Sequence, residues 1–410
     1  MTILHEYCFD LMDLVDHGCD TPMEEVLKNI IIACAMLLLI SACSPSDPDM
    51  IDVSISNDNV VSGQRIFVLV DAITDNPPMT YQWSTTGGEL NVVDSAQYSA
   101  YWIAPESAGS YSITCTVTDS EDKHISHTFD VRVRSRTLES DLFGTGLEVL
   151  TISKETEYKT GGIWASIKDN KLRYISATAN TESIWGMNFY TMLNRTDPAT
   201  FLYTIWGVVT PGNIIIELTE SSQNTLVCET CLPYDTINVL AMDGFVTGQI
   251  WVGTSSGLNY YDPSATTEAW KNYFYGQVND LSEGPDYVYA ATNSGIHRLD
   301  YTKSGPIYPG DTCAVLAASN SSESETTTDI WSVVQGYIQK NGEQLSVQPP
   351  EVICNLDQDI FGNIWCGKYW WDGTSWNAVP GLESVTIVRT VASLEGLTYL
   401  LSNSGALYRW

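Results

Sequence analysis

The segment IWVGTSSGLNYYD, from Ile250 to Asp262, is repeated in outline as VYAATNSGIHRLD, from Val288 to Asp300. Each copy has an aromatic residue at its second position, a glycine in the middle (Gly257, Gly295) and alternating residues that end in Asp. This pattern is typical of a β-hairpin, in which the glycine supplies the positive φ of a tight turn. A hairpin that recurs along a chain buries its faces against its own copies. The two segments therefore predict a β-propeller.

The aromatic residue of this hairpin recurs through residues 137–410 at a mean spacing of about 39 residues, the length of one four-stranded blade. The aligned aromatic residues are Trp164, Trp206, Trp251, Tyr289, Trp331, Trp365 and Tyr399. Most are preceded by a first strand with two apolar positions three residues apart, namely Ile237 and Leu240, Val278 and Leu281, Cys313 and Leu316, Ile353 and Leu356, and Val388 and Val391. We expect seven blades, with six or eight as the alternatives, because Trp185, Tyr203 and Trp206 compete for the second blade.

The last hairpin ends in ALYRW, which supplies only the third strand of a seventh blade. An unpaired strand edge at the seam of a ring is unfavourable, and closed β-architectures avoid it. The segment GLEVLTI, from Gly146 to Ile152, precedes the first blade and has the alternation of a strand. We expect it to close the ring beside the last blade.

Composition points to an all-β chain with more than one domain. The chain has 410 residues, which favours a propeller plus a smaller module. Its formal net charge of -31 repels phosphate backbones and anionic membrane surfaces, so we expect no nucleic-acid partner. The same charge attracts Ca²⁺, which is the one ion that we keep as a candidate; we expect no other cofactor.

The N-terminal 42 residues have the features of an export signal. Lys28 is followed by NIIIACAMLLLISA, an apolar run that is too short to span a bilayer, and then by Cys43. The sequence ISAC at residues 40–43 resembles the lipobox of bacterial lipoproteins. That resemblance implies a leader at residues 1–42, a diacylated Cys43 and, with Ser44 next, an outer-membrane lipoprotein that faces the periplasm or the cell surface. Residues 43–50 are rich in Pro and Asp and are expected to be a tether. The alternative is a buried apolar helix with an incidental cysteine.

Residues 51–135 contain short alternating strands separated by turns at intervals of about ten residues, as in a two-sheet sandwich. The run YQWSTTGGEL, with YWIAPESAGSYSITCTVTD after it, resembles the PKD and bacterial Ig-like domains of secreted proteins. The resemblance implies that Trp83 is the core tryptophan and that Tyr111 lies near a corner. Such domains are spacers or adhesive modules.

The segments GQIWVGTSSGL (from Gly248) and DIFGNIWCG (from Asp359) resemble the two-component regulator propeller repeat. In that family, the propeller is the periplasmic sensor of membrane histidine kinases. The resemblance therefore implies a role in sensing or binding in the cell envelope. Only the third blade keeps the full repeat, and no kinase sequence follows.

Four cysteines are candidates for disulfide bonds. Cys228 and Cys231 form a CETC pair in a loop, where an oxidising compartment favours a local disulfide over a redox or zinc site. Cys354 and Cys366 flank the turn QDIFGN, and opposed residues of a hairpin lie close enough for a disulfide after a small adjustment. A free Cys366 is the alternative.

The most aromatic stretch is KYWWDGTSWN, which contains Trp370, Trp371 and Trp376. Exposed tryptophan rings stack on sugars, so these three residues are our candidate ligand site; packing between blades is the alternative for each. Strand alternation predicts that Trp370 and Trp371 face opposite ways. Asp357, Asp359 and Gly362 resemble the start of a calcium loop, but the repeat itself places Asp and Gly there as an ordinary turn, which is the reading that we expect.

No catalytic residue and no metal site can be assigned from the sequence. The chain has five histidines, no Gly-x-Ser-x-Gly elbow and no ligand constellation for a metal. We therefore expect a lipid-anchored envelope protein, more a binder or sensor than an enzyme, whose propeller mouth recognises a glycan or an envelope protein. A propeller glycoside hydrolase or polysaccharide lyase is one alternative, and a passive structural spacer is the other.

Overall fold

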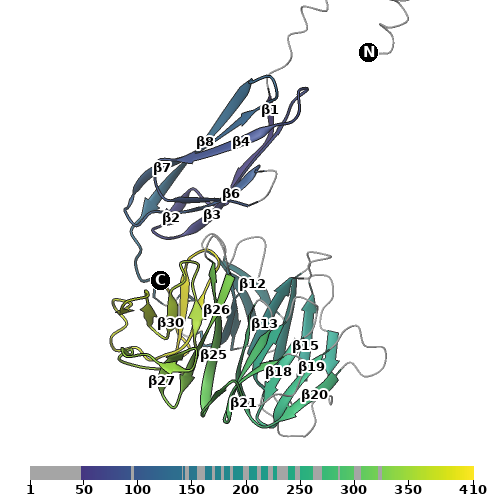
Figure 1. Ribbon diagram of the computed structural model, residues 1–410, viewed down its shortest axis with the longest axis vertical. Coiled ribbons are helices and arrows are strands. Elements are labelled where there is room, and N and C mark those ends of the chain that lie inside the picture. Colours follow the sequence, from purple (N-terminus) through teal and green to yellow (C-terminus); the bar gives the residue numbers. More distant parts are fainter. Residues whose placement is uncertain are drawn as a thin grey trace, which may run out of the picture.

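The computed structural model describes most of the chain from residue 48 onward. The described residues are 48–93, 97–140, 142–143, 147–154, 162–168, 171–176, 180–184, 188–196, 203–209, 214–219, 225–228, 239–244, 250–261, 270–284, 287–299, 306–321 and 326–410. All elements in these ranges are β-strands, arranged as a sandwich that stands on a propeller (Figure 1). None of the described segments is a helix long and apolar enough to cross a membrane. The expected leader at residues 1–42 and Cys43 lie outside these ranges.

The sandwich consists of two four-stranded sheets with one shared core. Its strands are β1 (Asp49–Ile55), β2 (Asn59–Val61), β3 (Arg65–Ile73), β4 (Thr80–Thr85), β5 (Glu89–Val92), β6 (Ser99–Ile103), β7 (Gly109–Thr118) and β8 (His124–Arg134). The sheets have the orders β1-β3-β6-β5 and β2-β8-β7-β4, and only β2 and β8 pair in parallel. Alternate residues of β3 are buried, as a strand with one face on the core requires.

The core tryptophan of the sandwich is Trp102, not Trp83. Trp102 on β6 is fully buried, and its indole N–H donates to the carbonyl oxygen of Gly87 at 2.8 Å. Trp83 on β4 only packs against the edge of this core and remains partly exposed. Tyr111 does lie at a corner, because its hydroxyl donates to the carbonyl oxygen of Ser107 at 2.9 Å.

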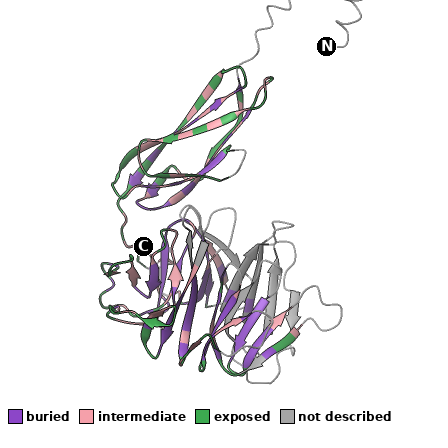
Figure 2. Ribbon diagram, in the orientation of Figure 1, coloured by how far each residue is buried: buried purple, intermediate pink, exposed green. Residues whose placement is uncertain are grey.

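The propeller contains seven successive antiparallel sheets, which we number in chain order. Their strands are β9 (Val149–Lys154), β10 (Ile163–Ile167), β11 (Lys171–Ile175) and β12 (Asn180–Ile184); β13 (Phe189–Thr196), β14 (Tyr203–Val209), β15 (Ile214–Thr219) and β16 (Thr225–Cys228); β17 (Val239–Gly244), β18 (Ile250–Thr254), β19 (Gly257–Tyr261) and β20 (Trp270–Tyr275); β21 (Val278–Glu283), β22 (Val288–Thr292), β23 (Gly295–Leu299) and β24 (Tyr308–Pro309); β25 (Thr312–Ser321), β26 (Thr326–Val334), β27 (Tyr337–Lys340) and β28 (Glu343–Gln344); β29 (Asp357–Gln358), β30 (Ile364–Cys366), β31 (Tyr369–Trp371) and β32 (Trp376–Ala378); and β33 (Ile387–Ala392), β34 (Thr398–Ser402) and β35 (Leu407–Arg409). Each aligned aromatic residue lies on the second strand of its own sheet. Buried residues run through the described strands of the sheets, and exposed ones mark their loops and the sandwich surface (Figure 2).

The repeated hairpin turn is held by a threonine in both copies. Thr254 and Thr292 each accept hydrogen bonds from the backbone N–H groups of the glycine and the residue before it, and donate to the glycine carbonyl. Gly295 has the expected positive φ, +138°, and a side chain there would collide with the backbone of Tyr308. The expectation was wrong for Gly257, which is not among the described glycines with positive φ.

The seventh sheet is closed by a segment upstream of the one that we expected. Glu139 exchanges backbone hydrogen bonds with Arg409, and the N–H of Leu142 donates to the carbonyl oxygen of Leu407 at 3.0 Å. The Glu139 carboxylate also pairs with the Arg409 guanidinium. The described part of the expected segment instead belongs to β9, which pairs with β10 in the first sheet, and it meets the last sheet through the N–H of Val149, which donates to the carbonyl oxygen of Gly405. The ring is therefore closed by Glu139 and Leu142.

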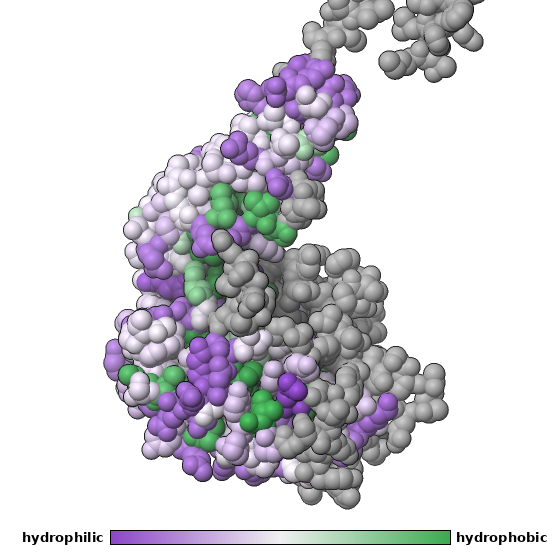
Figure 3. Space-filling model, viewed as in Figure 1, coloured by the Kyte–Doolittle hydropathy of each residue, from purple (hydrophilic) through white to green (hydrophobic). Residues whose placement is uncertain are grey.

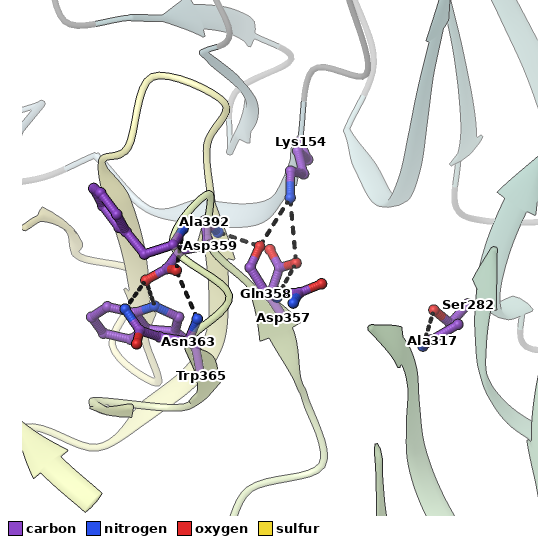
Figure 4. Close-up of polar contacts among 10 residues, drawn as sticks. Lys154, Ser282, Ala317, Asp357, Gln358, Asp359, Asn363, Trp365 and Ala392 are labelled. Carbon is purple, nitrogen blue, oxygen red and sulfur yellow. Dashed lines mark hydrogen bonds and ion pairs between the residues drawn. The ribbon is translucent and has the colours of Figure 1, made fainter. Parts of the chain in front are cut away.

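The first strand of each propeller sheet is its inner strand, and polar side chains on or just before some of these inner strands join neighbouring sheets. Each accepts a backbone N–H from the next inner strand, 35 residues further along the chain, in the pairs Asp280 and Val315, Ser282 and Ala317, Asn355 and Thr390, and Asp357 and Ala392. Figure 4 shows two of these bonds, together with Lys154, whose ammonium lies 3.6 Å from the Asp357 carboxylate. The same device thus recurs between the fourth and fifth sheets and between the sixth and seventh.

Replacing Asp357 with Ala should lower the free energy of unfolding by about 2 kcal/mol, because the buried N–H of Ala392 loses its acceptor. Asp357→Asn keeps an acceptor oxygen for this N–H, so its free energy of unfolding should fall by less than half as much. Chemical denaturation of both variants tests this order. Equal stability of Asp357→Ala and the wild type would show that the bond contributes nothing.

The sandwich touches the propeller through the turn between β2 and β3. The backbone N–H of Arg65 donates to the carbonyl oxygen of Glu395 at 2.7 Å. Arg136, in the connection after β8, donates to the carbonyl oxygens of Ser62 at 3.0 Å and Gly396 at 2.8 Å. One guanidinium therefore binds both domains, at the loop between β33 and β34.

Candidate functional site

A cavity of about 330 Å³ lies between the fifth and sixth sheets. It is lined by Asp329, Trp331, Lys340, Leu345, Phe361, Gly362, Asn363, Ile364, Trp371, Asp372 and Gly373. Strands β26 and β27 supply the first wall, and the second comes from β30, β31 and the turns beside them. The volume suits a small polar ligand such as one or two sugar rings.

Of the three tryptophans predicted as a ligand site, one lines this cavity. Trp371 does so, and its ring centre lies 5.7 Å from that of Trp376, whose indole N–H donates to the carbonyl oxygen of Val347. Trp370 packs on the opposite face of the sheet, where it stacks on buried Trp365 at 5.2 Å. The predicted alternation of Trp370 and Trp371 is confirmed, and Trp370 belongs to the packing between the sixth and seventh sheets.

Asp372 orders the turn that carries these tryptophans. Its carboxylate accepts hydrogen bonds from the backbone and side chains of Thr374 and Ser375 and from the side-chain amide of Asn377. These donors, the backbone N–H of Ser375 foremost, hold the pKa of Asp372 far below its usual range. Asp372 therefore carries its charge throughout the ordinary pH range.

An ion pair forms part of the opposite wall. The Lys340 ammonium lies 2.7 Å from the Asp329 carboxylate, which also accepts a hydrogen bond from the Asn341 side chain at 2.8 Å. The same ammonium lies 5.6 Å from the centre of the Trp331 ring. Trp331 and Lys340 are direct cross-strand partners on β26 and β27, so the hairpin register sets this arrangement.

The Asp359 turn uses its carboxylate internally. Asp359 accepts hydrogen bonds from the backbone N–H groups of Phe361 and Asn363, from the Asn363 side chain and from the Trp365 indole, as Figure 4 shows for Asn363 and Trp365. This is an Asx turn, and both carboxylate oxygens already have donors. Among the described residues, no group of three His, Cys, Asp or Glu is placed to hold a metal ion.

The disulfide near this site differs from the one that we expected. Cys354 is bonded to Cys313, and Cys366 is a buried free thiol, so the predicted Cys354 to Cys366 pairing is wrong. The hairpin pairs Asp357 with Trp365, and this register places Cys366 away from Cys354. The Cys366 sulfur instead accepts the N–H of Ile353 at 3.4 Å, and burial raises its pKa to about 11. The predicted Cys228 to Cys231 disulfide lies outside the described side chains.

Several residues of the cavity were missed in the sequence. Asp329 and Lys340 do not belong to any motif, and Phe361 was read only as part of a turn. The signal for Lys340 was the hairpin around Gly336, whose tight turn pairs it with Trp331. The position of Asp329 in the same cavity as Trp371 depends on the packing of two sheets, which no local pattern predicts.

These features define a β-propeller joined to a β-sandwich, with a partly aromatic cavity between two of its sheets. No protein-family model matches the chain, and no curated protein matches it. Among solved structures, the chain is similar to the extracellular domain of a Bacteroides thetaiotaomicron protein described as a one-component system, BT4673. The identity is 14%, the TM-score is 0.49, and the match covers 67% of this chain and 40% of that structure.

Two further solved structures from the same organism match a larger share of this chain. One is the extracellular domain of a protein described as a hybrid two-component system, BT3049, at 13% identity and a TM-score of 0.35, covering 89% of this chain and 52% of that one. The other is described as a quinonprotein alcohol dehydrogenase-like protein, BT1487, at 12% identity and a TM-score of 0.34, with 89% and 98% coverage. This chain thus spans less than two thirds of the two extracellular domains.

Proposed function

We propose that this chain is a cell-envelope binding protein that recognises a glycan in the cavity between the fifth and sixth sheets of its propeller. The observation that carries the proposal is the position of Trp371, which lines a cavity of sugar size beside the polar groups of Asp329 and Asn363. Aromatic faces with a few polar groups are the usual composition of small-ligand sites and of sugar sites in particular.

The described surface on one face of the molecule favours a small ligand over a protein partner. On the face seen in Figure 3, hydrophilic residues separate the apolar ones of the described region into small groups. Protein-binding surfaces usually present a larger continuous apolar patch. An envelope protein is therefore the second candidate partner.

The cavity carboxylates favour binding over hydrolysis. A glycoside hydrolase needs one carboxyl group with a raised pKa, so that it can donate a proton to the leaving oxygen. Asp372 has the opposite shift, and Asp329 pairs with Lys340. A hydrolase or lyase remains the alternative that product analysis would reveal.

The rest of the chain would present this cavity outside the cytoplasm. We propose seven blades for the propeller and an Ig-like or PKD domain for the sandwich, and the sheet orders β1-β3-β6-β5 and β8-β7-β4 match the two sheets of an immunoglobulin fold. A diacylated Cys43 would anchor the chain to the outer membrane. Globomycin treatment of cells and mass spectrometry of the mature N-terminus test the anchor.

Trp371→Ala should weaken glycan binding roughly tenfold or more, because the ring that stacks on the sugar is lost. A glycan array with the purified protein identifies the ligand, and calorimetry then compares the variants. Tyr337→Ala is the matched control, since Tyr337 is 51% exposed and lies at the other end of the β26–β27 hairpin from Lys340. Trp371→Phe, which keeps a ring, separates lost stacking from lost folding. Binding that survives Trp371→Ala in a folded protein would overturn this site, and shortened glycan chains would identify an enzyme.

A further inference from the structure

The cavity between the fifth and sixth sheets combines aromatic rings with an excess of negative charge. Its aromatic residues are Trp331, Phe361 and Trp371, and its charged residues are Asp329, Asp372 and Lys340. Two carboxylates against one ammonium leave a net charge of -1 on the lining. An anionic ligand is therefore disfavoured at this position, and a neutral or cationic one is favoured.

The negative charge persists under all ordinary conditions. The donors around Asp372 keep it ionised, and these donors, Thr374, Ser375 and Asn377, are neutral residues of its own turn. Behind the lining, Asp359 holds the side chain of Asn363, and the nearby Arg136 guanidinium offsets the Asp359 charge. The formal net charge of the whole chain, -31, acts in the same direction.

Lys340 already places one ammonium group in this environment. Its nitrogen lies 5.6 Å from the centre of the Trp331 ring and 2.7 Å from the Asp329 carboxylate. A cation over an aromatic face beside a carboxylate is the arrangement by which proteins recognise ammonium ligands. The Lys340 side chain is 41% exposed, whereas that of Asp329 is 16% exposed. The Lys340 ammonium is thus the more exposed group of this ion pair, and its flexible side chain allows it to move into solvent.

We propose that the cavity selects a saccharide that carries a free ammonium group, and that Lys340 occupies the ammonium position until the ligand arrives. The ligand ammonium would lie between the Asp329 and Asp372 carboxylates and against the aromatic rings, while its sugar ring stacks on Trp371. This assignment rests on the proposed glycan function and specifies the class of glycan. It also gives Lys340 the role of a competitor for the site instead of a ligand contact.

The test compares two ligands that differ only at the amine. Calorimetry with a glucosamine oligosaccharide and its N-acetylated counterpart of equal length, at a pH at which the amine is protonated, should show at least tenfold tighter binding of the free amine. Lys340→Met removes the side-chain ammonium and keeps a long apolar side chain. It should tighten binding of the free amine roughly tenfold and leave the affinity for the N-acetylated ligand unchanged. Lys340→Arg, which keeps the charge, is the matched control and should behave as the wild type. Asp329→Asn should weaken binding of the free amine alone.

The outcomes separate this inference from the function on which it rests. Binding of the N-acetylated ligand at equal or higher affinity would leave the glycan site standing and overturn the ammonium preference. Weaker binding of both ligands by Lys340→Met would show that Lys340 contacts the sugar and would also overturn it. If neither of these ligands nor any glycan on the array binds, the proposed function fails as well. Thermal melting of each variant shows that a lost signal is not lost folding.

Discussion

Replacing Cys313 with Ser should lower the free energy of unfolding by about 4 kcal/mol, the chain-entropy value for a disulfide that closes a loop of this length. The bond joins Cys313 and Cys354, which are 41 residues apart, and so connects the inner strand of the fifth sheet to the segment that enters the sixth. Without it, the unfolded chain gains freedom and two neighbouring sheets lose their covalent link. Urea denaturation under oxidising conditions measures the loss.

A reductant supplies the control for this prediction. Cys366→Ala leaves the disulfide intact, so that variant should still lose stability when the reductant is added, as the wild type does. Cys313→Ser should respond less than the wild type, because its Cys313–Cys354 disulfide is already absent. If Cys313→Ser and the wild type unfold at the same urea concentration without reductant, the bond does not stabilise the propeller.

Replacing Glu139 with Pro should cost about 3 kcal/mol, because proline removes the N–H that pairs with the carbonyl oxygen of Arg409 and reopens the edge of the seventh sheet. Thermal and chemical denaturation report the change. The effect should reach the whole ring, because an open seam exposes both the seventh sheet and the first.

Glu139→Gln separates the backbone from the side chain in this prediction. Glutamine keeps both backbone hydrogen bonds and loses only the ion pair with Arg409, which is partly exposed and should contribute about 1 kcal/mol or less. If the Pro and Gln variants lose equal stability, the backbone pairing does not hold the ring closed, and the ion pair accounts for the whole effect.

Much of the propeller was predictable because each repeat needs a bulky residue at one position of its second strand. Trp251 and Tyr289 established that position, and the other sheets followed from the same spacing. The closing segment was not predictable, since Glu139 and Leu142 lie only a few residues before β9 in the sequence. Which of these two segments completes the last sheet depends on the geometry of the closed ring.

The Cys313–Cys354 disulfide could have been predicted by aligning the repeats, but not from the hairpin that contains Cys366. The alignment of first strands places Cys313 at the position of Ile353, one residue before Cys354, and equivalent inner strands of adjacent sheets lie side by side. The hairpin argument failed because the hairpin is centred one residue further along the chain than assumed, with Gln358 opposite Ile364. A shifted register changes which residues face each other across a hairpin.

The cavity was only partly predictable for a related reason. Trp371 was identified from local aromatic density, and Lys340 follows from the register of its hairpin. That these two residues share a cavity is a property of the packing between the fifth and sixth sheets. Local sequence patterns describe single strands and turns, so they do not predict a site that two sheets form together.

The contact between the sandwich and the propeller has a mechanical consequence. Arg65 and Arg136 bind the loop between β33 and β34 from the sandwich side, while β1 begins at the far end of the sandwich (Figure 1). Tension applied to the propeller would therefore be transmitted through these hydrogen bonds to the sandwich, and along the length of the sandwich to β1.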